Sequence, residues 1–349
     1  MGIEVHGGIG KTGIVGLLRN GSSNRSVLLR ADMDALPIWE TSSHEYASLS
    51  NGVMHACGHD GHMSMLLGAA KFLSETRPFD GTVIFLFQPD EEQGRGAKAM
   101  LDDGLVARFE PNEAYAIHNL PAEPLGRFST RVGNICASES LFEIEIKAQG
   151  GHAAMPHTGV DAIVVGAELV QSLQTIVARK LAPASGAVVS ITDFVTDGRR
   201  NVLPGHATIT GDTRTRSPED TQRIEALMRQ IAAGVAAAHD VEIKVSFRTE
   251  FDVTINSSEQ VVAAVQVASG LGCETEPNRA PMSFSEDFGR LSTAIPGCFI
   301  LMGNGTEGAH AQPLHASDYD FNDEALPIGA AFWARLVAER LPLKETPNV

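Results

Sequence analysis

Nine residues near the beginning of the chain, 54–62, concentrate side chains that bind transition metals. They read MHACGHDGH, with one thiol, three imidazoles and one carboxylate. Cys57 and His59 are two positions apart, so on an extended segment both side chains point to the same side. Gly58 and Gly61 let the backbone bend closely around an ion. A converging thiolate and imidazole suit a borderline-soft transition metal, although a reduced cysteine beside solvated histidines is an alternative interpretation of this stretch alone.

Further polar side chains follow predicted strands at the points where those strands end. Apolar runs predict strands over 26–31, 82–87, 114–117 and 299–302. Ligands bind at the carboxyl ends of strands in open α/β sheets, so we expect the groups that follow these strands to meet at one sheet edge. Each group taken singly is also compatible with loop solvation, helix capping or a hydrogen-bonded core histidine. The groups are Asp32 and Asp34, Glu91 and Glu92, His118, and His315.

The candidate metal ligands form a set larger than one structural zinc ion requires. Four ligands complete a tetrahedral zinc site, whereas five suit two ions that share a bridging group. Two ions roughly 3.5–4 Å apart can hold and deprotonate one water and polarise a carbonyl. The predicted ligands are Cys57, His59, Glu92, His118 and His315.

Glu91, next to the candidate ligand Glu92, is the predicted general base. Adjacent carboxylates at a strand end point in different directions, so one can bind metal while the other faces the reacting water. Glu91 would take the proton from that water and pass it to the leaving nitrogen. Two nearby cations lower the pKa of a carboxyl group, so burial has to oppose them if Glu91 is to act near neutral pH.

Composition and charge restrict the class of protein and its partners. The chain has 349 residues, 43% of them hydrophobic and 20% charged, which indicates a soluble protein of two domains. No apolar run of about 18 residues and no secretory signal are visible, so no membrane span is expected. A net charge of −16 argues against nucleic acid and anionic membrane as partners. Four cysteines without regular spacing predict a reducing compartment, the cytoplasm.

The predicted strands and helices that position these groups indicate an α/β protein with an inserted domain. Residues 1–138 and 250–349 form the first domain, in which 283–289 reads as a loop. Asp60 is the expected N-cap of its first long helix. A further strand is predicted over 12–18, and helices over 62–74, 257–270 and 323–339.

Residues 139–249 form the predicted insertion, which reads as β-α-β-β-α-β and is therefore ferredoxin-like. Its second helix begins with Ser217 as the N-cap and Pro218 as the first helical residue. Its first helix is predicted over 160–178, and its strands over 141–147, 187–192, 207–213 and 241–247.

Eight ordered motifs resemble the metal-dependent aminoacylase, hippurate hydrolase and indole-acetyl-amino-acid hydrolase family of binuclear metallopeptidases. The resemblance implies a mixed-sheet catalytic domain of the phosphorylase/hydrolase-like sandwich type with an inserted lid. It implies two divalent metal ions on the five candidate ligands, with Cys57 bridging them and Glu91 acting as general base and acid. The motifs, which span essentially the whole chain, are RADMDALP, MHACGHDGH, FQPDEEQGRGAKAM, AIHNLP, GGHAAMPH, RRNVLP, SEDFG and PLHASDYDFND.

The same resemblance implies roles for three residues of the inserted domain. His152 looks like the family histidine that steadies the oxyanion, often in the partner's active site, and an imidazole N–H suits that task. Asn201 and Arg214 look like the groups that hold the substrate's carboxylate, for which the forked donors of arginine are suited. Because the family's lid commonly forms the dimer surface, a homodimer or tetramer is expected.

Two features depart from the family pattern. Family members usually carry one or two further helices before the position of Met1, with a His-x-x-Pro-Glu segment. Either a truncated gene product or a mis-set start is therefore expected, with exposed apolar surface on the first domain and reduced stability. Residues 193–200 (DFVTDGRR) replace a more glycine-rich turn before Asn201, and their two arginines either tune substrate choice or are solvated.

The predicted reaction is hydrolysis of the amide of an N-acyl or N-aroyl amino acid to a carboxylate and a free amino acid. The C-terminal motifs look most like hippurate-hydrolase members, so benzoyl-glycine is the first choice of substrate. Acetyl-amino acids, indole-acetyl conjugates and acyl-diaminopimelate stay open, as do Mn²⁺, Zn²⁺, Co²⁺ and Ni²⁺ as the metal.

Two alternatives belong to other classes. A non-catalytic metal-binding or ligand-binding protein on the same scaffold would have no need of the base Glu91. A thiol amidase would use Cys57 as nucleophile and His59 as base, but these two are too close in sequence for the usual pair.

Overall fold

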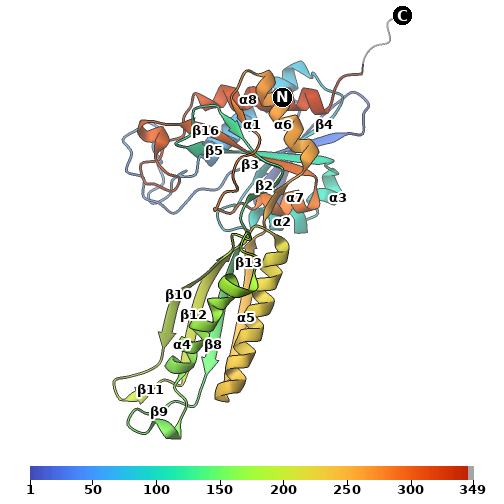
Figure 1. Cartoon of the computed structure of the whole chain (residues 1–349). Helices are drawn as coiled ribbons and strands as arrows, with labels where there is room; N and C mark the ends of the chain where they lie inside the picture. The colour runs from blue at the N-terminus through green and yellow to red at the C-terminus, as the bar shows by residue number, and fades with distance from the viewer. Residues whose placement is uncertain (345–349) are drawn as a thin grey trace, which may run out of the picture. The chain divides into compact units, whose positions relative to one another are not determined.

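The computed structural model describes residues 1–344, which form two compact units (Figure 1). Unit 1 comprises Met1–Ile135, Thr254–Pro281 and the chain from Glu286 onward. Unit 2 comprises Cys136–Val253 and Met282–Ser285. Unit 2 thus begins a little before the predicted boundary at 139, ends a little after that at 249, and takes in part of the predicted loop.

Unit 1 is built on an eight-stranded mixed sheet with the order β1-β2-β4-β3-β5-β16-β6-β15. Its four central strands run parallel, so their carboxyl ends lie at one edge of the sheet. Every residue of the innermost strand β3 is buried, as expected of a strand covered on both faces. These strands are β4 (Gly81–Gln88), β3 (Ser26–Asp32), β5 (Glu113–Pro121) and β16 (Gly297–Gly305).

The outer strands of this sheet are mostly shorter or more exposed than the central ones. The strand predicted over 12–18 is confirmed as β2, which pairs antiparallel with β4 and with β1. Strand β1 and the two-residue strands at the other edge were not predicted. Their bounds are β1 (Glu4–Ile9), β2 (Gly13–Asn20), β6 (Phe128–Ser129) and β15 (Thr275–Glu276), and a separate ladder joins β7 (Gly133–Cys136) to β14 (Thr254–Asn256).

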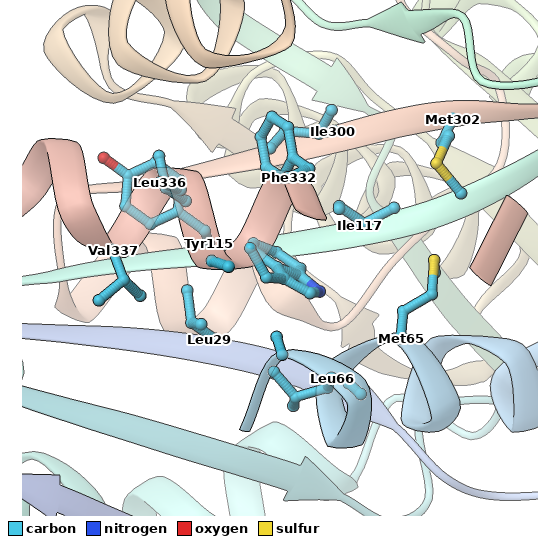
Figure 2. Packing of buried hydrophobic residues seen from close by; sticks show 14 of the residues in the cluster. Leu29, Met65, Leu66, Tyr115, Ile117, Ile300, Met302, Phe332, Leu336 and Val337 are labelled. Atoms are coloured by element: carbon cyan, nitrogen blue, oxygen red, sulfur yellow. The ribbon is translucent and has the colours of Figure 1, made fainter. Parts of the chain in front are cut away.

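Helices cover both faces of the sheet. The three long helices predicted for the first domain are confirmed as α1 (His59–Thr76), α6 (Ser258–Gly270) and α8 (Ala325–Arg340), which pack together on one face (Figure 1). Figure 2 shows side chains of α1 and α8 packed against the sheet, among them Leu66 and Phe332. Three short helices were not predicted: α2 (Gly96–Asp102), α3 (Leu105–Phe109) and α7 (Phe288–Ala294). Two of them, α2 and α7, pack together on the opposite face.

The start of α1 differs from the prediction. Its N-cap is Gly58 rather than Asp60, and His59 is the first helical residue rather than part of an extended segment. Gly58 has the left-handed φ of 85°, and a Cβ there would lie 2.4 Å from Asn119 Oδ1. Only glycine meets both conditions without strain, so the chain turns sharply between Cys57 and His59. Asp60 instead accepts a hydrogen bond from Gly61 N in the first turn.

Unit 2 has a four-stranded antiparallel sheet in the order β10-β12-β8-β13. With its two helices it has the chain order β-α-β-β-α-β, which is the predicted ferredoxin-like arrangement. Ser217 caps α5 by accepting a hydrogen bond from Asp220 N, as predicted. The elements are β8 (Glu139–Lys147), α4 (Ala162–Leu173), β10 (Val188–Thr196), β12 (His206–Arg214), α5 (Pro218–His239) and β13 (Glu242–Phe251), with a small ladder of β9 (Gly151–His152) and β11 (Val202–Leu203).

The helix predicted over 160–178 is interrupted: α4 ends at Leu173, and a π-helical turn, Ile176–Lys180, follows. By length and composition alone the stretch Ala162–Lys180 is long and apolar enough to cross a membrane. Its buried residues, including Val165 and Leu169, belong to the hydrophobic core of unit 2, which accounts for the apolar character.

Unit 1 exposes apolar surface beside α1. A cavity of about 440 Å³ is lined by residues that include Ile3, Met63 and Leu67. A second cavity, of about 460 Å³, is lined by Phe72 of α1 and by alanines of α8. Other large apolar side chains of unit 1, including Trp39 and Leu49, are exposed away from these cavities.

Candidate active site

The groups predicted at strand ends do meet at the carboxyl edge of the unit 1 sheet. Asp32 ends β3, and Asp34 follows two residues later. Glu91 and Glu92 lie in the turn directly after β4. The remaining predicted groups come from the start of α1, from β5 and from the loop before α8: Cys57 and His59, His118, and His315.

Donor atoms of the five predicted ligands lie at separations that a shared ion would produce. Cys57 Sγ is 3.4 Å from His118 Nε2. One oxygen of Glu92 is 3.4 Å from His315 Nε2, and the other is 3.9 Å from His59 Nε2. Two ligands at tetrahedral angles around one ion, each at ~2.0–2.3 Å, lie roughly 3.3–3.8 Å apart. The two separations of 3.4 Å fall within this range and that of 3.9 Å lies just above it, so the set is spaced much as metal ligands are.

Two buried polar atoms in this cluster have no hydrogen-bond partner within residues 1–344. They are His59 Nε2 and Glu92 Oε1. Buried polar groups are nearly always paired, and an unpaired one calls for an explanation such as an ion. Cys57, Glu92 and His315 also offer one ligand atom each within 4.8 Å of one another. The residues present thus fit divalent metal ions.

Asp34 orients two of the predicted ligands. Its backbone oxygen and Oδ1 lie 2.9 and 3.2 Å from His59 Nδ1, which must donate to them. Its Oδ2 accepts a hydrogen bond from Glu92 N at 3.0 Å. A metal-binding histidine usually donates its other ring N–H to a carboxylate or a carbonyl. The contacts of Asp34 therefore leave His59 Nε2 facing Glu92.

Asp32 hydrogen-bonds to two side chains outside the predicted ligand set. Its Oδ1 lies 2.5 Å from His62 Nδ1, and its Oδ2 accepts a hydrogen bond from Arg30 Nη1 at 2.7 Å. His62 in turn contacts Asn119 through Nε2, at 2.7 Å from Oδ1 and 3.0 Å from the backbone nitrogen. His62 therefore supports Asp32 and Asn119 through hydrogen bonds.

His315 is held in an unusual backbone conformation. Its φ is +68°, a left-handed value that non-glycine residues adopt infrequently. Its backbone nitrogen donates to Ala56 O at 2.8 Å, which ties this loop to the segment that carries Cys57. The side chain is 51% exposed, so this predicted ligand lies on the solvent side of the cluster. Strain of this kind is concentrated at functional sites.

Glu91 is almost fully buried, with 6% of its surface exposed. A carboxylate oxygen of Glu91 lies within 4.8 Å of ligand atoms of both His59 and Glu92. Burial, together with the nearby Glu286 and Asp287 carboxylates, raises the pKa of Glu91 well above the usual value. The prediction required burial to oppose the effect of cations on this group, and burial is the largest cause of the shift.

The electrostatics of the cluster indicate an excess of negative charge. Burial alone would lower the pKa of His59, but the carboxylates of Asp32 and Asp34 outweigh it and raise the pKa to about 9. Burial and then the carboxylates of Glu92 and Glu91 raise the pKa of the Cys57 thiol well above its usual value. A bound cation would compensate this negative charge.

The three residues predicted in the insertion do not all lie together within unit 2. His152 pairs with Val202 in the β9–β11 ladder, and Ala153 N donates to Asn201 O, so His152 and Asn201 are neighbours. Arg214 ends β12, whose other end at His206 is nearer to that ladder in the chain. A nine-residue strand spans about 26 Å, so the length of β12 separates Arg214 from His152 and Asn201.

The guanidinium of Arg214 already has partners in unit 2. It donates to Asp212 Oδ2 at 2.9 Å and to Ser285 Oγ at 2.8 Å, and it pairs with Glu139. Both His152 and Asn201 are exposed. These partners of Arg214 could not be predicted from the sequence, because a pattern of strands gives no side-chain contacts.

Comparisons with known proteins find relatives over most of the chain. The model of Peptidase family M20/M25/M40 matches residues 28–339. The hippurate hydrolase of Campylobacter jejuni is 39% identical over 342 residues, which cover 97% of this chain and 88% of that protein. The N-acetylcysteine deacetylase of Bacillus subtilis is 34% identical over 329 residues, covering 93% and 84%.

A solved structure extends the likeness to the fold. It is that of the Bacillus subtilis YXEP protein, described as a dinuclear metal-binding peptidase of the M20 family. It superimposes with a TM-score of 0.83 at 30% sequence identity, over 97% of this chain and 88% of that one.

Proposed function

The chain belongs to Peptidase family M20/M25/M40 and is a hydrolase of amide bonds, and from this premise we propose that it cleaves N-acyl amino acids with two divalent metal ions. The observation that carries the proposal is the cluster of five ligands at one sheet edge with Glu91 beside them. Cys57, His59, Glu92, His118 and His315 would hold the ions, with the Cys57 sulfur shared between them.

The proposed reaction assigns one task to each group. Bound divalent ions would polarise the scissile carbonyl and acidify the attacking water. Glu91 takes the proton from that water and delivers it to the departing nitrogen. His152 steadies the negative charge on the carbonyl oxygen, and Asn201 and Arg214 bind the carboxylate of the amino acid.

Benzoyl-glycine is the proposed first substrate. The similarity to a hippurate hydrolase over nearly the whole chain supports it. The similarity to an N-acetylcysteine deacetylase keeps an acetyl-amino acid as the second candidate. Mn²⁺, Zn²⁺, Co²⁺ and Ni²⁺ all accept a mixture of thiolate, imidazole and carboxylate ligands, so the metal is proposed only as one of these four. The cytoplasmic location stays a prediction.

A metal-reconstituted hydrolysis screen tests the proposal. The purified protein, stripped with EDTA and reloaded in turn with each of the four metals, should release glycine from benzoyl-glycine and be inactive while stripped. A binding protein would take up metal and hydrolyse no member of a panel of benzoyl, acetyl and indole-acetyl amino acids. A thiol amidase would be indifferent to EDTA and lose activity with an alkylating agent. Either result would contradict the metallohydrolase.

We further propose that the active enzyme is a homodimer or tetramer that assembles through unit 2. The span of β12 separates Arg214 from His152 and Asn201 by more than the length of an N-acyl amino acid, so one chain cannot easily supply all three to one substrate. β10 is an edge strand of the unit 2 sheet and exposes Val188 and Val195, as an interface strand does.

Mixing two inactive variants tests this assembly. Light scattering should give two or four times the mass of one chain. Glu91→Gln and His152→Ala proteins, each inactive alone, should regain part of the wild-type activity after they are unfolded and refolded together, because a mixed dimer contains one intact site. A monomeric active enzyme, or a mixture that stays inactive although it forms mixed dimers, would overturn the shared site.

A further inference from the structure

Two fully buried charged residues, Arg30 and Asp287, lie beside the centre without being among its proposed ligands. Their side chains are 1% and 0% exposed. Burying charges costs free energy that pairing does not always recover, and apolar side chains of similar volume often stabilise a protein more. Stability alone is therefore a poor reason for this network. The contacts of this network instead indicate that it holds neighbouring groups in a fixed geometry.

Asp287 ties together both ends of the loop that carries Glu91. Its carboxylate accepts from Gln88 Nε2 at 2.8 and 2.9 Å, and Gln88 is the last residue of β4. The same carboxylate accepts from Ala97 N at 2.8 Å, in the first turn of α2. The backbone nitrogen of Asp287 lies 3.4 Å from Glu91 Oε1. One residue thus contacts the beginning, the end and the functional side chain of the loop.

The loop itself is tight and strained. Asp90, directly before Glu91, has a left-handed φ of 53°. A Cβ at Gly96 would lie 1.5 Å from Pro89 O, so the two ends of the turn approach closely. A strained conformation persists only where the surrounding structure over-determines it. Asp287 provides such determination from outside the loop.

Arg30 connects this loop to the metal-binding side of the site. It donates to Asp287 Oδ1 at 2.9 Å and to Gln88 Oε1 at 3.1 Å. Its Nη1 donates at 2.7 Å to Asp32, which in turn contacts His62. Because the planar guanidinium presents its donors in a fixed fork, Arg30 sets the relative positions of these groups.

We propose that Asp287, held by Arg30, is a positioning residue that keeps the carboxylate of Glu91 directed at the reacting water. Glu91 belongs to two clusters: its carboxylate lies within 4.8 Å of ligand atoms of His59 and Glu92, and within 4.8 Å of carboxylate oxygens of Glu286 and Asp287. The inference rests on the proposed hydrolase function, because it assigns Asp287 a task in that reaction.

The substitution Asp287→Asn tests the proposal with little change of volume. An asparagine cannot accept from Gln88, Ala97 and Arg30 at once, because its amide nitrogen is a donor. A misplacement of about 1 Å in a catalytic group can cost about 100-fold in rate, so we expect kcat to fall about 10- to 100-fold. KM and bound metal should stay within about twofold of wild type, because the ligands and substrate groups are untouched.

The matched control is Asp80→Asn. Asp80 is also buried in unit 1 and accepts from backbone nitrogens, those of Ser22 and Ser23 at 2.6 and 2.7 Å. It precedes β4 at the opposite end from Glu91. Asp80→Asn should lower the unfolding temperature while leaving kcat unchanged. This control separates a loss of stability from a loss of positioning.

A double variant tests whether the loss of kcat in Asp287→Asn arises through Glu91. In a Glu91→Gln background, Asp287→Asn should change the residual rate by less than about threefold, because residues that act as a unit are non-additive. If Asp287→Asn does not fold, Gln88→Met removes one donor from the same carboxylate and should lower kcat with KM unchanged. Wild-type kcat in Asp287→Asn or Gln88→Met, or a full additive loss in the double variant, would overturn the proposal. Absence of hydrolysis by the wild type would instead overturn the proposed function.

Discussion

Replacing Glu91 with Gln should lower kcat by about 10²- to 10⁴-fold, which is the usual contribution of a positioned general acid and base. Glutamine has the shape of glutamate and cannot accept the proton of the attacking water at neutral pH. Because Glu91 is not among the proposed ligands, the variant should bind as much metal as wild type. Steady-state hydrolysis of benzoyl-glycine and elemental analysis of the same sample measure the two quantities.

Glu113→Gln is the control for this substitution. Glu113 is another buried glutamate of unit 1, paired with Arg340 at the amino end of β5, away from the carboxyl edge. Its loss should lower stability and leave kcat near wild type. A Glu91→Gln protein that keeps more than about a tenth of wild-type kcat would contradict the role of general base, since even the weaker end of the expected range is 100-fold.

The convergence of the site could be predicted from the sequence because parallel strands impose it. Apolar runs marked β3, β4, β5 and β16, and a polar group followed each one. In a parallel sheet, all such groups arrive at one edge whatever the loops between them do. Topology alone therefore brings Asp32, Glu91 and His118 together.

What the sequence did not reveal depends on contacts between distant segments. Arg30 and Asp287 are 257 positions apart and meet only in the folded chain. Their signal was present as an arginine within a mostly apolar strand and an Asp in the SEDFG motif, but the Asp also fits a solvated loop. The N-cap of α1 was misassigned for a similar reason. Asp60 satisfies the capping preference, yet the close approach of Asn119 to Gly58 decides where the helix starts.

The proposed sharing of the Cys57 sulfur between two ions leads to the second large effect. Replacing Cys57 with Ala should lower metal affinity by more than about 100-fold, since losing only an orienting neighbour of a ligand typically costs 10- to 100-fold. Its sulfur lies 3.4 Å from His118 Nε2 and belongs to the same cluster as Glu92 and His315. One truncation therefore weakens both proposed ion positions. Hydrolysis should fall with the metal content, and added metal should no longer raise the unfolding temperature.

Cys298→Ala is the matched control, because Cys298 is a second buried cysteine of unit 1, in β16, with Thr130 as its neighbour. Removing this thiol creates a cavity of similar size in the same unit, so its cost in stability should be comparable, while metal content and kcat stay at wild-type levels. If Cys57→Ala retains two ions per chain and full activity, the sulfur is not shared between them. The electrostatics favour the expected loss: the carboxylates of Glu92 and Glu91 help burial to raise the pKa of the Cys57 thiol, so a cation is what would make a thiolate stable there.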